Sequence, residues 1–320
     1  MADTSSSQSP LGGVGVTALL VAAARAIETS RPDALASDEY AEHFVRAAPA
    51  GAGWPVRLDQ VPAQAADPLW GRLARFFGLR TRAFDDFLLR RATEGCRQVV
   101  LLGAGLDTRA HRLPWPRGCR VFEIDQAEVL LFKEAVLRKR DAVARAERIT
   151  VATDLRRQWA DALTAAGFDP ACPTAWLAEG LLPYLPPAAE EELVRTVHAH
   201  SAPGSALAYE IKQGVDPTAA RDYPVYAAAR ERIALDLLAM FDARPRPDSL
   251  GDLRGRGWSA EVCTPFDLTR RYGRGLEPEP DDAVAANRWI FSLLPASGHP
   301  GAPGAPGRSG TPSTDRRACQ

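Results

Sequence analysis

Three carboxylate side chains stand directly after short apolar runs, where they could bind hydroxyl or amino groups. Asp125 follows "VFEI", Asp154 follows the run at 148–152, and Glu179 follows "TAWLA". A carboxylate at the end of a strand can accept hydrogen bonds from both hydroxyls of a ribose. Asp125 also stands before an expected helix, where it could instead act as an N-cap. The repetition of acids after successive runs favours a nucleoside pocket.

A glycine turn comes before these acids. The apolar run "QVVLL" at 98–102 leads into "GAG" at 103–105. Gly103 can adopt a positive φ, and Gly105 lets a ligand approach the backbone. A dinucleotide fingerprint would place a third glycine at position 108, which is threonine, and no Gly-Lys-Ser/Thr follows the turn. The sequence therefore disfavours a phosphate cradle, although a plain strand-to-helix turn remains open.

The turn and the acids together predict a ligand that has a ribose and a base but no phosphate. S-adenosyl-L-methionine fits, because its sulfonium cation tolerates nearby carboxylates. We expect Asp125 to bind the ribose, Asp154 to face the adenine amino group and Leu155 to lie against the ring. The turn would then lie beneath the methionine part of this cofactor.

Alternating strands and helices must position these residues. Helix-compatible segments such as 126–146 and 187–202 separate the apolar runs, which predicts an α/β fold with a mostly parallel sheet. Its seven strands and late strand pair indicate a Rossmann-like class I methyltransferase. The expected strands span residues 98–102, 119–124, 148–152, 174–178, 205–211, 258–264 and 287–294.

One methyltransferase domain is expected over residues 13–295. The polar stretch 1–12 and the Gly/Pro/Ser-rich tail 296–320 cannot bury a core, so both ends are expected to be disordered. Apolar residues at helical spacing in "ARERIALDLLAMF" predict that a helix crosses the insertion before the sixth strand. Within the domain we expect a helical N-terminal cap at 13–92, a cofactor-binding core at 96–211, a mostly helical substrate-side insertion at 212–257 and a C-terminal strand pair at 258–295.

Composition argues against several other classes of protein. The formal net charge is −1, so no basic excess indicates a nucleic-acid partner. The apolar stretch "VGVTALLVAAARAIE" reaches Arg25 and Glu28 too early to span a membrane, and no basic leader precedes it. The cysteines and histidines do not form a metal-ligand pattern. We expect a cytoplasmic, metal-free enzyme, and the sequence does not indicate its oligomeric state.

Longer motifs carry a resemblance that extends over roughly residues 13–294. They include "RTRAFDDFL", "QVVLLGAGLDTRAHRLPWP", "VFEIDQAEVLLFK" and "TAWLAEGLLPYLPP". In order and spacing the chain resembles the leucine carboxyl methyltransferase family. It is most similar to the actinomycete branch of S-adenosylmethionine-dependent O-methyltransferases, which includes the carboxyl methyltransferase of tetracenomycin polyketide biosynthesis.

The resemblance implies roles for particular residues. Arg80 would pair with the carboxylate of the cofactor, and Arg82 competes for that role. Glu179 would lie near the cofactor amino group. The full set of cofactor-binding residues implied is Arg80, Gly103, Ala104, Gly105, Asp125, Gln126, Asp154, Leu155 and Glu179.

The acceptor is expected to be a small molecule that is methylated on oxygen, such as a polyketide of secondary metabolism. A carboxylate is ionised at neutral pH and needs no general base, whereas a phenol would benefit from one. No convincing His/Asp pair is present, which favours a carboxylate over a hydroxyl. Tyr184 and Tyr209 could touch the acceptor, although each could equally be a structural aromatic. The alternatives are a protein carboxyl methyltransferase and a cofactor-binding protein without catalysis.

Overall fold

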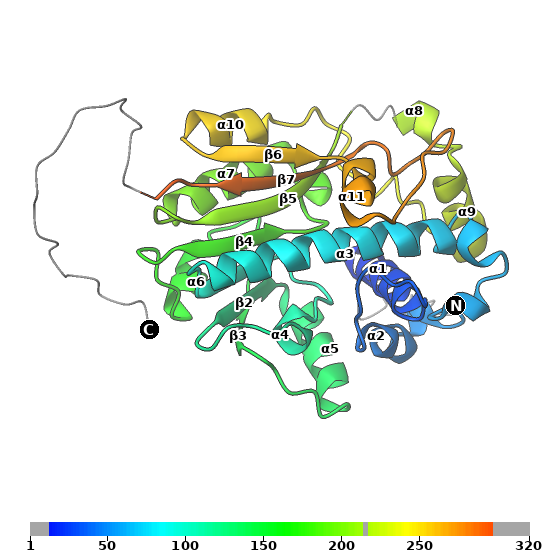
Figure 1. The fold of residues 1–320 in the computed structure, drawn as a ribbon, viewed down its shortest axis with the longest axis horizontal. Helices are drawn as coiled ribbons and strands as arrows, with labels where there is room; N and C mark the ends of the chain where they lie inside the picture. Colours follow the sequence, from blue (N-terminus) through cyan, green and yellow to red (C-terminus); the bar gives the residue numbers. More distant parts are fainter. Residues whose placement is uncertain (1–12, 214–216, 297–320) are drawn as a thin grey trace, which may run out of the picture.

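A seven-stranded sheet forms the centre of the computed structural model, which describes residues 13–213 and 217–296 (Figure 1). The strand order is β3-β2-β1-β4-β5-β7-β6. The first five strands are parallel, and β7 runs antiparallel to both of its neighbours. The strands are β1 (Gln98–Leu102), β2 (Arg120–Asp125), β3 (Glu147–Ala152), β4 (Thr174–Ala178), β5 (Ala206–Lys212), β6 (Ser259–Cys263) and β7 (Asn287–Leu293).

This order and the single reversed strand define the class I methyltransferase fold, which confirms the predicted fold class. All seven predicted strands are present, and every boundary lies within one residue of its expected position. The agreement has a physical cause. Strands buried on both faces of a parallel sheet are nearly continuous apolar runs, and polar connections separate them.

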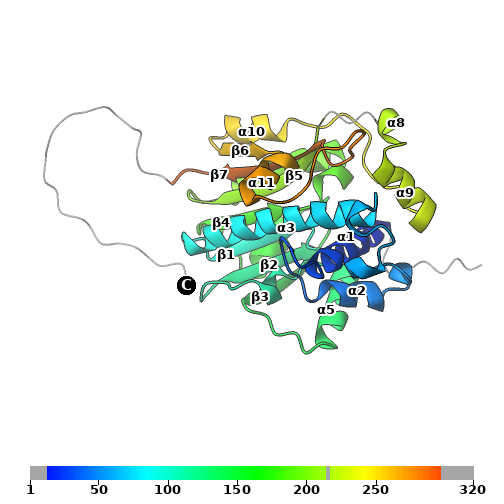
Figure 2. The same cartoon turned by 45° about the vertical axis from the view of Figure 1, so that its right-hand side comes forward.

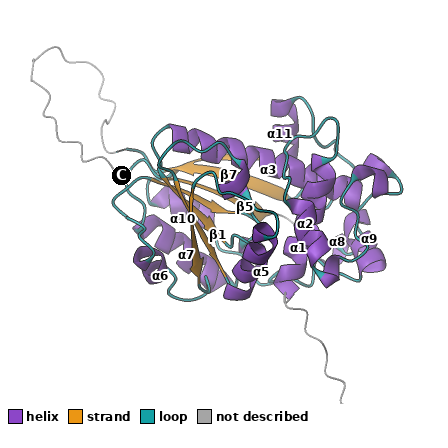
Figure 3. Ribbon diagram, turned by 90° about the horizontal axis from the view of Figure 1, so that it is seen from below, coloured by secondary structure: helices purple, strands orange, loops and turns teal. Residues whose placement is uncertain are grey.

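Helices cover both faces of the sheet (Figure 3). Four of them connect the parallel strands, and three precede the first strand. The helices are α1 (Gly13–Thr29), α2 (Ala41–Ala47), α3 (Trp70–Thr93), α4 (Arg109–Arg112), α5 (Ala127–Arg138), α6 (Ala160–Ala165), α7 (Pro187–Ala199), α8 (Pro217–Ala220), α9 (Pro224–Ile233), α10 (Ser249–Gly255) and α11 (Pro265–Tyr272).

Alternation along the strands divides the core between the two faces. On β1, Val99 and Leu101 join the cluster that includes α1 and α3. Val100 and Leu102 point to the opposite face and join the cluster under α7. Successive side chains of a strand point to opposite faces, so this one apolar run supplies both layers of the core.

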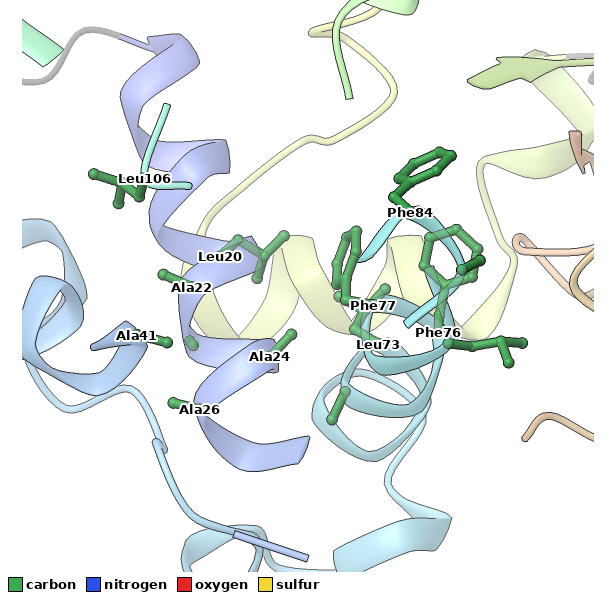
Figure 4. Packing of buried hydrophobic residues seen from close by; sticks show 14 of the residues in the cluster. Leu20, Ala22, Ala24, Ala26, Ala41, Leu73, Phe76, Phe77, Phe84 and Leu106 are labelled. Carbon is green, nitrogen blue, oxygen red and sulfur yellow. The ribbon is translucent and has the colours of Figure 1, made fainter. Parts of the chain in front are cut away.

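The N-terminal cap packs through small side chains on α1. Leu20 and Ala24 point toward α3, whereas Ala22 and Ala26 point toward α2 (Figure 4). All four side chains are buried, with at most 5% of their surface exposed. Alanines let the neighbouring helices approach closely on two sides. The alanine-rich sequence therefore holds α1 against the rest of the molecule, close to the carboxyl ends of the parallel strands (Figures 1 and 2).

The insertion at 212–257 is less helical than predicted. Its helix α9 ends at Ile233, and Ala234 takes a left-handed conformation with φ 53°. The prediction of a helix through 229–241 is therefore wrong beyond Ile233. The apolar spacing there has another origin: Leu237 is buried, and Phe241 packs against the ring of Tyr184.

Residues 1–12, 214–216 and 297–320 lie outside the described part of the chain. The two ends predicted to be disordered therefore fall almost entirely outside it.

Candidate functional site

A cavity of about 300 Å³ opens where the parallel strands end. The loops after β1, β2, β3 and β4 line one end of it, and α3, α9 and the start of β7 line the other. In open α/β sheets, ligands bind outside the carboxyl ends of the strands. The cavity contains every cofactor-binding residue predicted from the sequence, namely Arg80, Gly103, Ala104, Gly105, Asp125, Gln126, Asp154, Leu155 and Glu179.

Both glycines of the turn at 103–105 have a positive φ, which was predicted for Gly103. Gly103 has φ +67° and Gly105 has φ +46°. A Cβ on Gly103 would lie only 3.0 Å from Leu181 Cδ1, so glycine also keeps this wall open.

The backbone N–H groups of Ala104 and Gly105 in the turn already have partners within the protein. Ala104 N donates to Ile124 O at 2.9 Å, and Gly105 N donates to Asp125 Oδ2 at 2.6 Å. Asp107 N donates to Ala104 O at 2.8 Å. A phosphate cradle needs free N–H groups aimed at the ligand. The structure therefore supports the expectation that this turn does not hold a phosphate.

Asp125 ends β2 and faces the cavity. Its Oδ1 accepts a hydrogen bond from Gln126 N at 2.7 Å, and its Oδ2 accepts the one from Gly105. Burial raises the pKa of Asp125, and these two N–H groups oppose that shift. Each carboxylate oxygen keeps a second lone pair for a ligand hydroxyl. The N-cap of α5 is Gln126, which makes no side-chain cap, so helix capping does not account for Asp125.

Asp154 and Leu155 follow β3, the strand next to β2, and line the same cavity as Asp125. Arg156 Nη2 donates to Asp154 Oδ2 at 2.6 Å, and this contact lowers the pKa of Asp154. Leu155 is 8% exposed and packs into the core. Both residues have the position that adenine recognition would need, and that role stays a prediction.

Glu179 follows β4 and belongs to a buried charge network that the sequence analysis missed. Arg109 Nη1 donates to Glu179 Oε2 at 2.6 Å, and Arg109 Nε donates to Asp85 Oδ1 at 2.7 Å. Arg109 is only 2% exposed and also contacts Asp107. Burial alone would raise the pKa of Glu179, but Arg109 and Arg80 lower it, so Glu179 is held as an anion.

Arg80, rather than Arg82, faces the cavity. Its Nε lies 2.9 Å from Glu179 Oε1, and its Nη1 donates to Glu210 Oε1 at 2.5 Å. Arg82 is not among the residues that line the cavity, and its Nε donates to Asp86 on the exposed side of α3. A contact between Arg80 and the cofactor carboxylate stays a prediction.

A family model identifies the family to which this chain belongs. The model described as leucine carboxyl methyltransferase matches residues 18–198. The chain belongs to the leucine carboxyl methyltransferase family. The match covers the N-terminal cap and the strands that carry Gly103, Asp125, Asp154 and Glu179, and it ends within α7.

Two relatives that cover most of the chain carry methyltransferase names. A relative from Streptomyces coelicolor is 62% identical over 282 residues, which cover 88% of this chain and 93% of that protein. One from Saccharopolyspora erythraea is 45% identical over 88% of this chain and 95% of its own length. Both are provisionally named S-adenosyl-L-methionine-dependent methyltransferases. A solved structure from Thermobifida fusca, provisionally named a methyltransferase, aligns at 17% identity over 79% of this chain and 94% of its own, with a TM-score of 0.48, and carries no weight in this assignment.

The protein is thus an S-adenosyl-L-methionine-dependent methyltransferase, and its own residues fit this cofactor. Carboxylates at three strand ends suit the hydroxyl, amino and ammonium groups of the cofactor. Because Gly103 has no Cβ, the space between the turn and Leu181 stays free for a ligand. Among the described residues, no group of three or more histidines, cysteines or acids could hold a metal ion, and no helix is both long and apolar enough to cross a bilayer.

The two tyrosines predicted to contact the acceptor have different positions. Tyr184 lines the cavity, and its ring lies 5.3 Å from that of Phe241. Tyr209 does not line the cavity, because its side chain points to the opposite face of β5, is 1% exposed and packs with Leu253 and Trp258. The suggestion that Tyr209 touches the acceptor is therefore wrong.

The sequence analysis also missed two polar residues that line the cavity where β5 ends and α9 begins. Lys212 is the last residue of β5, and its Nζ donates to the hydroxyl of Tyr226 on α9 at 3.3 Å. Lys212 follows directly on the predicted strand at 205–211, so its place at the ligand edge could have been inferred. Tyr226 had no such signal, because only the folded chain brings α9 to this edge.

Proposed function

We propose that this methyltransferase acts on an oxygen of a small secondary metabolite such as a polyketide, and on a carboxylate ahead of a hydroxyl. The observation that carries the proposal is the wall at the acceptor end of the cavity. Its apolar residues come from α3, from the segment after α9 and from the segment before β7. They are Leu73, Phe76, Phe77, Leu237, Phe241 and Val284.

This wall supports a small acceptor rather than a protein chain. Phe76 is 5% exposed, Phe77 is 8% exposed and Leu237 is 8% exposed, so these three side chains are buried in the wall. Enclosed, mostly apolar cavities of a few hundred Å³ are typical of small-molecule sites. A peptide terminus would need a wider approach across these side chains.

The acids of the described cavity support a carboxylate acceptor, because each is already engaged. Glu210 accepts hydrogen bonds from Arg80, from Gly180 N at 2.7 Å and from Trp289 Nε1 at 3.1 Å. No histidine lines this cavity. A hydroxyl acceptor gains from a general base, whereas a carboxylate arrives ionised.

The mechanism then consists mainly of positioning. When bound, S-adenosyl-L-methionine supplies a methyl group that its sulfonium has already activated. Asp125, Asp154 and Glu179 would hold the cofactor, while Phe76 and Phe241 would exclude water from the acceptor. Holding the reacting atoms in line supplies much of the rate enhancement in such displacements. We infer that the reaction takes place in the cytoplasm, where cells make this cofactor.

Radiolabelled methyl transfer tests the proposal. The purified protein is incubated with methyl-labelled S-adenosyl-L-methionine and either a small-molecule extract or the protein fraction of a Streptomyces culture. We expect label in the small-molecule fraction, in a product that releases methanol in strong alkali. Label in protein would support the alternative acceptor class, and an alkali-stable product would refute methyl ester formation.

A further inference from the structure

Lys212 differs from the other cations that line the cavity. Arg25 pairs with Asp38, Arg80 pairs with Glu179 and Glu210, and Arg156 pairs with Asp154. Within the described part of the chain, Lys212 is the one lining cation without a carboxylate partner at ion-pair distance. A partly buried cation is costly unless an anion or strong acceptors compensate it.

Lys212 contacts two aromatic side chains. Its Nζ lies 5.1 Å from the ring centroid of Phe241 and donates to the Tyr226 hydroxyl. Burial lowers the pKa of Lys212 to about 8, Glu210 opposes that shift and Arg80 adds to it. Burial also raises the pKa of Tyr226 to about 12, so this hydroxyl stays protonated and keeps its own proton to donate.

We propose that Lys212 and Tyr226 together bind the carboxylate of the methyl acceptor, so that the acceptors of this enzyme carry a carboxylate on an apolar body. The inference rests on the proposed function and names its specificity contact. An ammonium and a phenol that both donate to one carboxylate form charge-assisted hydrogen bonds. The apolar body would lie against Phe76, Phe77 and Leu237, which line the same end of the cavity.

The chemistry is consistent with a lysine that keeps its proton. One carboxylate oxygen forms the bond to the methyl carbon while the carbon–sulfur bond breaks and its electron pair goes to sulfur. No proton moves in this step. The acceptor changes from an anion to a neutral ester, so the attraction of Lys212 for it is lost and product release is favoured.

The scarcity of lysine makes a direct test possible. Lys133, Lys139 and Lys212 are the three lysines of the sequence, in which lysines and arginines together number 39. Protein labelled with ¹³C at lysine Cε is saturated with S-adenosylhomocysteine and titrated with pH by NMR. The titration is repeated with 2-naphthoate, with the neutral 2-naphthamide and with 2-naphthol. The K212M variant assigns the Lys212 signal, and exposed Lys139 is the internal control.

We expect 2-naphthoate to raise the pKa of Lys212 by at least about one unit, as a nearby opposite charge does, while 2-naphthamide and Lys139 show no such shift. K212M should bind 2-naphthoate at least tenfold more weakly than the wild type, and K212R should recover most of that affinity. Y226F should weaken 2-naphthoate binding several-fold without a change in S-adenosylhomocysteine affinity.

Several results would overturn the inference. They are a Lys212 signal that ignores 2-naphthoate, a K212M variant that binds it normally, or a 2-naphthol complex in which Lys212 loses its proton and acts as a base. Each would leave methyl transfer itself intact, provided that S-adenosylhomocysteine still binds. If the wild-type protein does not bind S-adenosylhomocysteine at all, the proposed function itself is refuted.

Discussion

Removal of the Asp125 carboxylate should weaken cofactor binding without unfolding the protein. In the structure each of its oxygens accepts one backbone N–H, from Gly105 at 2.6 Å and from Gln126 at 2.7 Å. One lone pair on each oxygen remains for a ribose hydroxyl. Hydrogen bonds to a charged group contribute about 1.5–3 kcal/mol each, and water partly replaces them in the variant. Two such bonds contribute about 3–6 kcal/mol, and because water recovers about half of this in the variant, D125A should bind S-adenosylhomocysteine roughly 10- to 150-fold more weakly.

The same change should cost little stability. It leaves two backbone N–H groups beside the cavity, where water can reach them, so we expect a loss of about 1–2 kcal/mol. Isothermal titration calorimetry gives the dissociation constant, and urea unfolding gives the free energy of unfolding. E128A is the matched control, because Glu128 is an exposed acid in the first turn of the neighbouring α5.

The result that would refute this reasoning is a D125A variant that is folded and binds S-adenosylhomocysteine within twofold of the wild type. Asp125 would then serve only to tie the glycine turn to β2. D125N adds a second comparison, since it keeps the shape of the side chain but not its charge. We expect it to lose most of the affinity that D125A loses.

Three further predictions concern two buried ion pairs and the pH dependence of the reaction. R109M should weaken S-adenosylhomocysteine binding about tenfold in calorimetry, because Glu179 loses a partner at 2.6 Å; unchanged affinity would mean that Arg80 alone holds it. K133M should lower the free energy of unfolding by about 1.5–3 kcal/mol, because fully buried Glu123 loses the ammonium that lies 2.9 Å away and keeps only Arg148 as a cationic partner; exposed K139M should change it by less than about 0.5 kcal/mol. For the true acceptor, kcat should be flat from about pH 6.5 to 8.5, since a carboxylate is ionised throughout that range. In the same profile kcat/KM should fall above about pH 8, where Lys212 loses its proton; a kcat that rises tenfold per pH unit would indicate a phenol instead.

The strands and the cofactor half of the site could be predicted from the sequence because both depend on local patterns. A buried parallel strand is a short apolar run, and its ligand-binding residues follow it directly in the chain. Gly103, Asp125 and Glu179 each stand at the end of such a run, and all three line the cavity. Their placement therefore needed no knowledge of long-range contacts.

The charge network and the acceptor end could not be predicted in the same way. Arg109 looks like any arginine in a polar connection, and only folding buries it against Asp85 and Glu179. The prediction of a helix through 229–241 was wrong after Ile233. Apolar residues every three or four positions also occur in a loop whose apolar side chains line a cavity. Tyr209 was misplaced because its direction depends on which face of β5 meets the ligand, and short sequence patterns do not fix that.

The reversed direction of β7 has a consequence for how acceptor choice can evolve. Because β7 runs antiparallel to β5, the segment before it returns to the ligand edge and brings Val284 and Asn287 into the cavity. Half of the apolar acceptor wall, namely Leu237, Phe241 and Val284, thus lies beyond the matched residues 18–198. Substitutions there can alter substrate range while the cofactor cradle stays intact. Exchange of this C-terminal portion between relatives is accordingly a practical route to hybrid enzymes with new acceptors.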